Sequence, residues 1–187
     1  MTTLIVNVDQ LRWERDSAGD ALWGEKYFSG IAFEGHPTNN SVLSVTGYRF
    51  GKRHGASREW NVEGRLIDEE YEDVGGSHGP FRKWYPNGQL AESGHTEHSI
   101  NVRFQRWDEN GRLLEEKYLL ESDPRFAKLE AERERAPSPI IDIDLKTLSF
   151  FDRARDWGRS AADLPPPQPA PSLELCRLLS ARSLADR

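Results

Sequence analysis

Five histidines, one cysteine and one glycine-rich segment are the residues of this 187-residue chain whose types could support chemistry. His54 and His78 occupy equivalent places in two repeated segments, and His95 and His98 lie three positions apart where no helical pattern is present. On strands two apart in a sheet, His54 and His78 would lie roughly 10 Å from each other, too far to share one metal ion. We therefore expect structural roles in turns for this pair, and we expect no metal and no cofactor.

The remaining reactive groups do not indicate catalysis. Residues 75–79 (GGSHG) resemble a phosphate-binding loop, but such a loop precedes a helix, and the pattern here predicts a strand. Cys176 is the single cysteine, which excludes an intramolecular disulfide and a multi-cysteine zinc site. We predict no catalytic residues and no enzymatic activity, and we keep an enzyme on an unusual β scaffold as a third hypothesis.

Acidic side chains are concentrated in one part of the chain. Acidic residues outnumber basic ones by 31 to 25, and residues 59–73 alone carry seven acids against Arg65. Such a surface either keeps exposed strands from self-associating or steers a basic partner into place. It repels nucleic acid and anionic lipid, so we expect a protein partner. Without a basic leader or an apolar run near the ~18 residues of a membrane span, we expect a cytoplasmic protein.

A threefold internal repeat is the strongest pattern in the sequence. Residues 54–71, 78–95 and 101–118 align so that each Trp is followed by Gly four positions later and by Leu six positions later. A looser unit precedes them at about 27–48, and two of the units open on His-Gly. We expect these aligned positions to be structural, namely Gly55, Trp60, Gly64, Leu66, Gly79, Trp84, Gly88, Leu90, Trp107, Gly111 and Leu113.

Each repeated segment is typical of a β-hairpin. In residues 85–89 (YPNGQ), proline presets the turn and glycine takes the left-handed conformation, as in a type I turn followed by a one-residue bulge. This turn pairs Tyr85 with Gln89 and Trp84 with Leu90. If the pairing continues without interruption, Arg82 faces Glu92 two residues further from the turn. The equivalent pairs in the other units are Arg58 with Asp68 and Gln105 with Glu115. Because a single hairpin is only marginally stable, the units must stack.

The sequence therefore predicts an all-β fold, an array of antiparallel β-hairpin repeats in an extended twisted sheet with a short C-terminal helix and tail. We expect an N-terminal capping strand within 1–22, the hairpin array at 23–120, a helix and a second capping strand (140–145) within 121–151, and a proline-rich flexible tail at 152–187.

Two helices are expected outside the array. Ser122 or Asp123 can cap the first, with Pro124 in its first turn. The second, in the tail, has leucines at 175, 178 and 179, which indicate at most a short amphipathic helix that is mobile or only weakly docked.

The segment Tyr48-Arg-Phe-Gly51-Lys-Arg-His54-Gly55 resembles the MORN repeat, whose units carry Tyr and then Gly-Lys-x-His-Gly on a period of about 23 residues. The recurring Trp-x-x-x-Gly-x-Leu resembles the bacterial variant of this repeat found in YwqK-type antitoxins, and residues 23–30 (WGEKYFSG) are similar to the opening segment of such chains. The resemblance covers roughly residues 20–120. It implies a β-hairpin scaffold, usually without catalysis, that binds another protein, which for the antitoxin-like members is a cognate toxin.

From the charge pattern and this resemblance we expect a non-enzymatic protein-binding module of the antitoxin or immunity type. It would neutralise a basic toxin by covering the toxin's site. A MORN-like scaffolding or membrane-surface protein is the alternative. The repeated Trp side chains are expected to pack the array, and other aromatic and charged residues to contact the partner: Glu59, Glu69, Phe81, Tyr85, Phe104 and Arg106.

Overall fold

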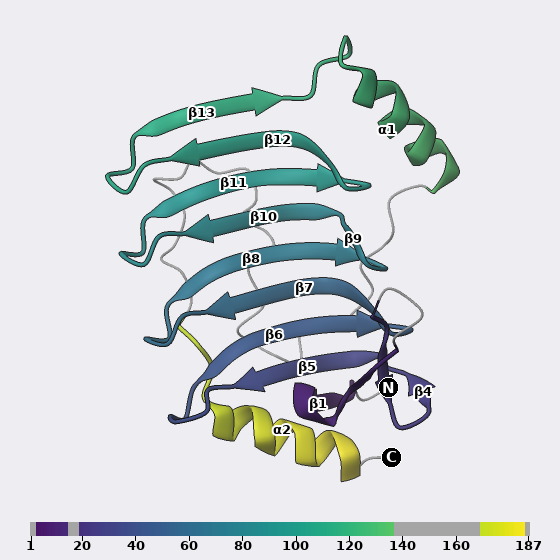
Figure 1. Cartoon of the computed structure of the whole chain (residues 1–187), viewed down its shortest axis with the longest axis vertical. Helices are drawn as coiled ribbons and strands as arrows, with labels where there is room; N and C mark the ends of the chain where they lie inside the picture. The colour runs from purple at the N-terminus through teal and green to yellow at the C-terminus, as the bar shows by residue number, and fades with distance from the viewer. Residues whose placement is uncertain (1–2, 15–18, 137–168, 186–187) are drawn as a thin grey trace.

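Stacked β-hairpins form one large open sheet, which Figure 1 shows as a ladder. The computed structural model describes residues 3–14, 19–136 and 169–185. All neighbouring strands of this sheet are antiparallel except β1 and β5, so the predicted all-β array is confirmed. In spatial order the strands are β1 (Ile5–Asn7), β5 (Gly30–Gly35), β6 (Val42–Arg49), β7 (Lys52–Trp60), β8 (Leu66–Asp73), β10 (Gly79–Trp84), β11 (Leu90–Glu97), β12 (Ile100–Trp107) and β13 (Leu113–Tyr118), and β9 (Gly76–Ser77) pairs only with β8.

The glycine-containing turns close the hairpins as the sequence predicts. The N–H of Tyr85 donates to the Gln89 carbonyl at 2.9 Å, and the N–H of Gly88 donates to the Tyr85 carbonyl at 2.8 Å. The turns after β7 and β12 contain the same two bonds. Gly88 has a φ of +86°, a left-handed conformation that glycine adopts without steric cost.

The pairing beyond each Trp–Leu pair differs from the predicted register by one residue. Trp84 faces Leu90, but Ala91 is an extra residue on its strand, so Lys83 rather than Arg82 faces Glu92. Such a β-bulge recurs in all three hairpins and exchanges the faces on which the following side chains lie. The predicted pairs Arg82–Glu92, Arg58–Asp68 and Gln105–Glu115 are therefore wrong, and the observed pairs are Lys83–Glu92, Glu59–Asp68 and Arg106–Glu115.

The connections between hairpins are tighter than the turns within them. Phe50-Gly51, Val74-Gly75 and His98-Ser99 are two-residue turns with positive φ at every position, as type I′ turns require. The first positions of these turns, Phe50, Val74 and His98, are spaced 24 residues apart. The structural repeat therefore includes these turns, although their residue types differ. The turn between the first two of these units is therefore Val74-Gly75, at the start of the glycine-rich segment 75–79.

The repeated tryptophans pack the array, as predicted. Trp60 and Trp107 are buried, and Trp84 packs on the main apolar cluster. Of the repeated leucines, Leu66 and Leu90 are buried, whereas Leu113 is exposed on β13, which is the last of the described strands in this sheet. The remaining repeated glycines, Gly55, Gly64, Gly79 and Gly111, all have positive φ.

The first 27 residues form more than the capping strand expected within 1–22. β1 pairs with β5, and β2 (Arg12–Trp13), β3 (Ala21–Trp23) and β4 (Lys26–Tyr27) form a separate three-stranded sheet after a short 3₁₀ turn, η1 (Val8–Gln10). This small sheet helps to enclose an apolar cluster that includes Leu11, Phe28 and Tyr48. The cluster closes the N-terminal end of the array.

The C-terminal part of the expected flexible tail is docked. α2 (Leu173–Ala185) inserts Leu173 and Cys176, 5% and 4% exposed, into the main cluster with Phe33, Val42 and Trp60. The leucines that suggested this helix are not its buried face, since Leu175 and Leu178 are exposed. The N–H of Leu173 also donates to the Asn40 carbonyl. The tail expectation therefore needs correction for residues 169–185, where the helix belongs to the fold.

The helix expected after the array is present as α1 (Pro124–Arg135), capped by Asp123. Arg133 of this helix makes two bonds of 2.9 Å with the Glu97 carboxylate, which tie α1 to the end of β11. The second capping strand expected at 140–145 lies outside the described residues, as do residues 164–168 of the proline-rich tail. Neither of the two described helices has the length and hydrophobicity that crossing a bilayer requires.

Candidate protein-binding face

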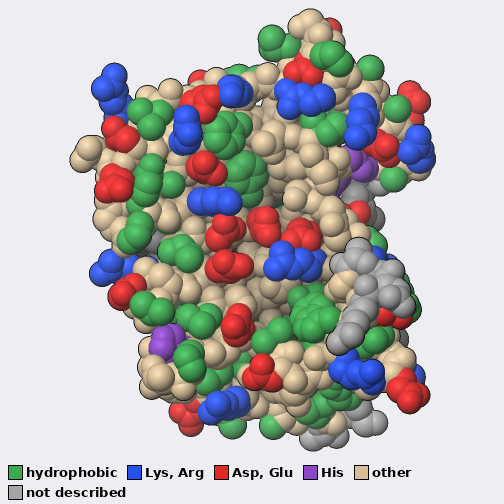
Figure 2. Space-filling view, viewed as in Figure 1, with side chains coloured by type: hydrophobic (Ala, Val, Ile, Leu, Met, Phe, Trp, Pro, Cys, Tyr) green, Lys and Arg blue, Asp and Glu red, His purple; other side chains and the backbone are tan. Residues whose placement is uncertain are grey.

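One face of the sheet carries a row of charged side chains that crosses six strands. The paired residues are, in order from β7 to β13, Glu59, Asp68, Lys83, Glu92, Arg106 and Glu115. Side chains two apart on a strand share a face, so Glu70, Glu72, Phe81 and Phe104 belong to the same surface. We name it the front face. Figure 2 looks onto it and shows acidic side chains gathered over the middle of the sheet.

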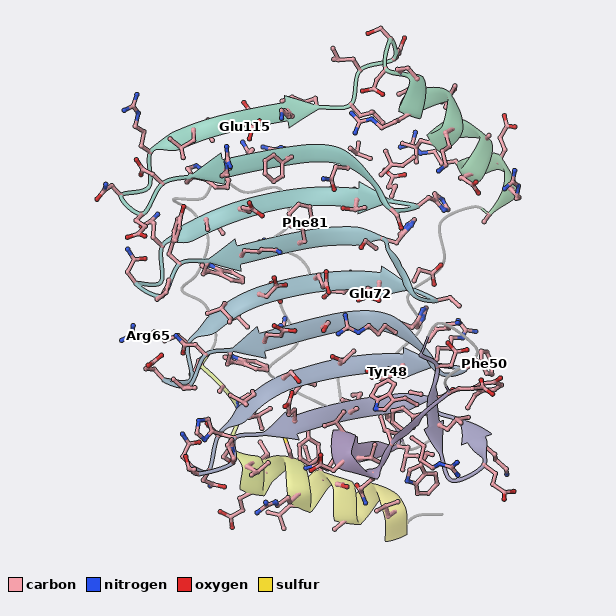
Figure 3. The ribbon with its side chains drawn as sticks, in the orientation of Figure 1. Tyr48, Phe50, Arg65, Glu72, Phe81 and Glu115 are labelled. Carbon is pink, nitrogen blue, oxygen red and sulfur yellow. The ribbon has the colours of Figure 1, made fainter. Side chains whose placement is uncertain are left out.

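Two stacked phenylalanines lie beside this row. The rings of Phe81 and Phe104 have centroids 6.4 Å apart and an interplanar angle of 28°. Gly94 pairs with both residues from the intervening strand, and an added Cβ there would come within 2.5 Å of the Phe81 ring. The missing side chain of Gly94 therefore makes room for the aromatic pair. Figure 3 shows Phe81 between Glu72 on β8 and Glu115 on β13.

The carboxylates on β8 are crowded. Burial raises the pKa of Asp68, and the charges of Glu59 and Glu92 raise it further while Lys83, 3.4 Å away, lowers it. Burial likewise raises the pKa of Glu70, with Glu72 and Asp68 adding to the effect. Arg53 pairs with Glu72 at 2.9 Å and lies only 3.5 Å from Glu70. The local cations therefore leave the acids of β8 incompletely neutralised.

Some of the predicted contact residues are accessible on the front face, and others make contacts within the chain. Glu59 and Arg106 are exposed on the front face, and Phe81 and Phe104 are half-buried there. Glu69 is only 5% exposed and contacts Arg58, so it is a poor candidate for contacting a partner. Tyr85 is half-buried, and its hydroxyl donates to the Trp107 carbonyl at 2.9 Å, which links two neighbouring turns.

The acidic run at 59–73 is therefore not one surface. Strand alternation directs Asp68, Glu70 and Glu72 to the front face, while Glu69 lies on the other face and Glu63 in a turn. The sequence does not predict Asp68 and Glu70 as contact residues, because without the β-bulges it assigns them to the other face of the sheet. The signal that could have identified them is the alternation of acids within β8 itself.

The histidines meet in a pair that their sequence spacing does not indicate. The His78 and His98 rings are 4.9 Å apart and edge-to-face, and the N–H of His98 donates to Nδ1 of His78 at 3.3 Å. Burial lowers the pKa of His78, and the nearby His98 lowers it further. His54 is buried, with Nδ1 3.0 Å from Asp73 Oδ1. Among the described residues, no three His, Cys, Asp or Glu side chains are grouped as metal ligands.

The glycine-rich segment has a second pattern, since residues 75–79 also match Gly-x-Ser-x-Gly with Ser77 at its centre. That motif supplies a nucleophile where a strand turns sharply into a helix. Here Ser77 lies in β9 and is followed by β10, and its carbonyl accepts from the N–H of Ser99. A cavity of about 410 Å³ adjoins this segment, lined in part by His78, His98 and Lys128. The backbone arrangement is that of neither a nucleophile turn nor a phosphate-binding loop.

Comparison of the chain with models of known protein families, with curated proteins and with solved structures finds no match. The architecture of the chain is an open, mostly antiparallel sheet of stacked hairpins, and its front face combines acidic and aromatic side chains.

Proposed function

We propose that this chain is a non-enzymatic protein-binding module whose front face receives a basic segment of another protein. The observation that carries the proposal is that Asp68 and Glu70 lie partly buried and close to other carboxylates on β8, and burial, with these neighbours adding to it, raises the pKa of both carboxyl groups. Raised carboxyl pKa values mean that ionisation of these acids at neutral pH opposes folding. A basic partner would supply the missing positive charge, and the interaction would compensate for this cost.

The aromatic pair supports the same proposal. Phe81 and Phe104 are half-buried beside the acidic row, so a partner could cover apolar surface and charge together. Interfaces gain most of their affinity from a few anchors of this kind, while surrounding charges increase the association rate and the specificity. The exposed Arg106 and Lys83 on the same row would form ion pairs with carboxylates of the partner and so set the partner's orientation.

The function we propose is neutralisation by occlusion, as for an antitoxin or immunity protein. A sheet held by backbone hydrogen bonds along its whole length presents a preformed surface, so little ordering entropy is lost on binding. Covering a cationic active site would block substrate access without a chemical step. This part of the proposal depends on the resemblance to MORN-type antitoxins, with which the open hairpin array is compatible.

Affinity capture with charge-matched variants tests the binding proposal. The front-face variant Asp68→Asn/Glu70→Gln and the control variant Glu63→Gln/Glu109→Gln each remove two negative charges, but the control residues lie in turns. We expect basic proteins from the native host to be retained by the wild type and the control, and lost with the front-face variant. Retention that follows net charge alone, or no retained protein at all, would contradict the proposal.

A second assay separates the antitoxin role from the scaffolding or membrane-surface alternative. The captured protein is expressed with and without this chain, and growth rescue that requires Asp68 and Glu70 is expected for an antitoxin. Co-sedimentation with anionic liposomes, in the absence of any retained protein, would favour the membrane-surface alternative instead.

A further inference from the structure

The two ends of the large sheet are finished differently. At one end β1 is only three residues long, and α2 lies alongside it. At the other end β13 pairs only with β12 among the described strands. Figure 1 shows α1 at the end of β13 rather than along its outer edge. Among residues 3–14, 19–136 and 169–185, no strand pairs with the outer edge of β13.

The open edge carries exposed apolar side chains. Leu113, Leu114, Tyr118 and Leu120 are 46%, 54%, 54% and 63% exposed, and all four lie within eight residues. Edge strands of monomeric proteins are normally short, charged or covered, because an exposed apolar edge favours pairing with another chain. β13 also carries Glu115, Glu116 and Lys117, but its exposed apolar side chains would gain from being covered by another strand.

The backbone of β13 has polar groups directed outward. The N–H of Leu119 donates to the Val102 carbonyl at 2.9 Å, so residue 119 directs its backbone groups toward β12. These directions alternate along an antiparallel strand, and the N–H and C=O groups of Glu116 and Tyr118 therefore point away from the sheet. A partner strand could accept and donate hydrogen bonds at both positions.

We propose that β13 pairs antiparallel with β13 of a second copy of this chain, which joins two sheets into one. A two-fold axis perpendicular to the sheet keeps the two front faces on the same side of the joined sheet. Residues that face each other across the interface must then have side chains on the same face, so the register can change only in steps of two residues. When the axis passes through Glu116, each Lys117 faces Glu115 of the other copy, and each Tyr118 faces Leu114. Charge complementarity thus selects the second copy as the occupant and fixes the register.

The neighbouring registers are less favourable. Centring the axis on Glu115 or on Lys117 places two like charges together and leaves no Lys–Glu pair across the interface. The chosen register keeps one like-charge contact, between the two Glu116 side chains. In each copy, Glu116 already accepts hydrogen bonds from Gln105 at 2.5 Å and from the Tyr118 hydroxyl at 2.7 Å, which disperse its charge.

A charge swap across the axis tests the interface. The oligomeric state is measured by analytical ultracentrifugation over a micromolar concentration series, where we expect the wild type to reach twice the 21.4 kDa chain mass. Glu115→Lys and Lys117→Glu should each raise the dimer Kd by roughly tenfold or more, since each converts two attractive contacts into repulsive ones. The double variant should regain most of the affinity. Glu116→Gln, which removes the like-charge contact, should tighten the dimer.

Two results would overturn this inference. One is a wild type that stays monomeric over the whole series, and the other is a dimer that neither single reversal weakens. Because Glu115 also contacts Arg106 at 3.2 Å and Lys117 within the chain, thermal melting is recorded for every variant. Glu116→Pro supplies a test independent of charge, since it removes an outward N–H that β12 does not use, and it should abolish the dimer while the monomer remains folded. None of these variants alters Asp68 or Glu70, so the result is separable from the proposed function.

Discussion

At the residue scale, Glu70 links the proposed function to stability. Its native pKa is raised by burial and by the nearby Glu72 and Asp68, so the native state binds protons more readily than the unfolded chain. Stability therefore falls as the pH rises through the carboxyl range, and the loss is complete at neutral pH. A carboxylate kept at this position despite its cost is consistent with a partner that needs the charge.

Glu70→Gln should increase stability at neutral pH. We expect a gain of a few tenths to about 1 kcal/mol, the range for relieving repulsion between like charges that share one face of a sheet. The gain should shrink as the pH is lowered and wild-type Glu70 becomes protonated, which thermal melts at several pH values would measure. A loss of stability at neutral pH would mean that the contact with Arg53 outweighs the repulsion, contrary to the account.

Gly94 is the residue on which the aromatic pair depends. A Cβ at this position would lie 2.5 Å from both the Phe81 ring and the Arg103 carbonyl oxygen. Gly94→Ala should therefore destabilise the fold by about 1–3 kcal/mol, the usual range for overpacking. Because the backbone contact remains, Phe81→Ala should restore only part of the loss in a double variant. An unchanged melting temperature in Gly94→Ala would contradict the described packing.

At the element scale, α2 connects the end of the chain to the first hairpins. Cys176 lies on its buried face, and burial raises the pKa of the thiol to about 11. The thiolate is the reactive form, so a docked helix protects Cys176 from alkylation. As the single cysteine, it reports on docking without interference.

Alkylation of Cys176 at neutral pH should thus be much slower than that of an exposed thiol. Leu173→Ala should accelerate it, because a cavity of this kind costs about 2–5 kcal/mol of stability and loosens the helix. Leu178→Ala is the matched control, since Leu178 is exposed and its truncation should leave the rate unchanged. Rapid labelling of the wild type would show that α2 is not docked in solution.

The elements differ in how well the sequence predicts them. Turns with glycine at a position of positive φ are local, so the hairpins and the Trp–Leu pairs follow from sequence alone. The β-bulge at Ala91 has no such local marker, and its omission assigned Arg82 in place of Lys83 to the charged row. Docking of α2 depends on contacts with Val42 and Trp60, far away in the sequence, which its weak helical pattern does not reveal.

At the scale of the whole molecule, the hairpin ladder distributes two kinds of surface. The front face exposes acidic and aromatic groups over the middle of the sheet, and the last strand exposes an apolar edge. Dimerisation through β13 would place two front faces side by side in one continuous sheet. Two binding faces in one assembly would increase the apparent affinity for any partner that presents two basic segments. The composition indicates an acidic protein, but it does not indicate where the acidic and apolar surfaces lie, because their positions depend on the strand register and the strand order.

Site-specific photo-cross-linking in the native host tests the central claim most directly. A photoreactive phenylalanine analogue replaces Phe104 on the front face, and the same analogue replaces Val62, an exposed turn residue, as the control. The account predicts that position 104 cross-links to a basic protein and that position 62 does not. Cross-linking of the same proteins from both positions, or of no protein from position 104, would contradict a partner bound to the front face.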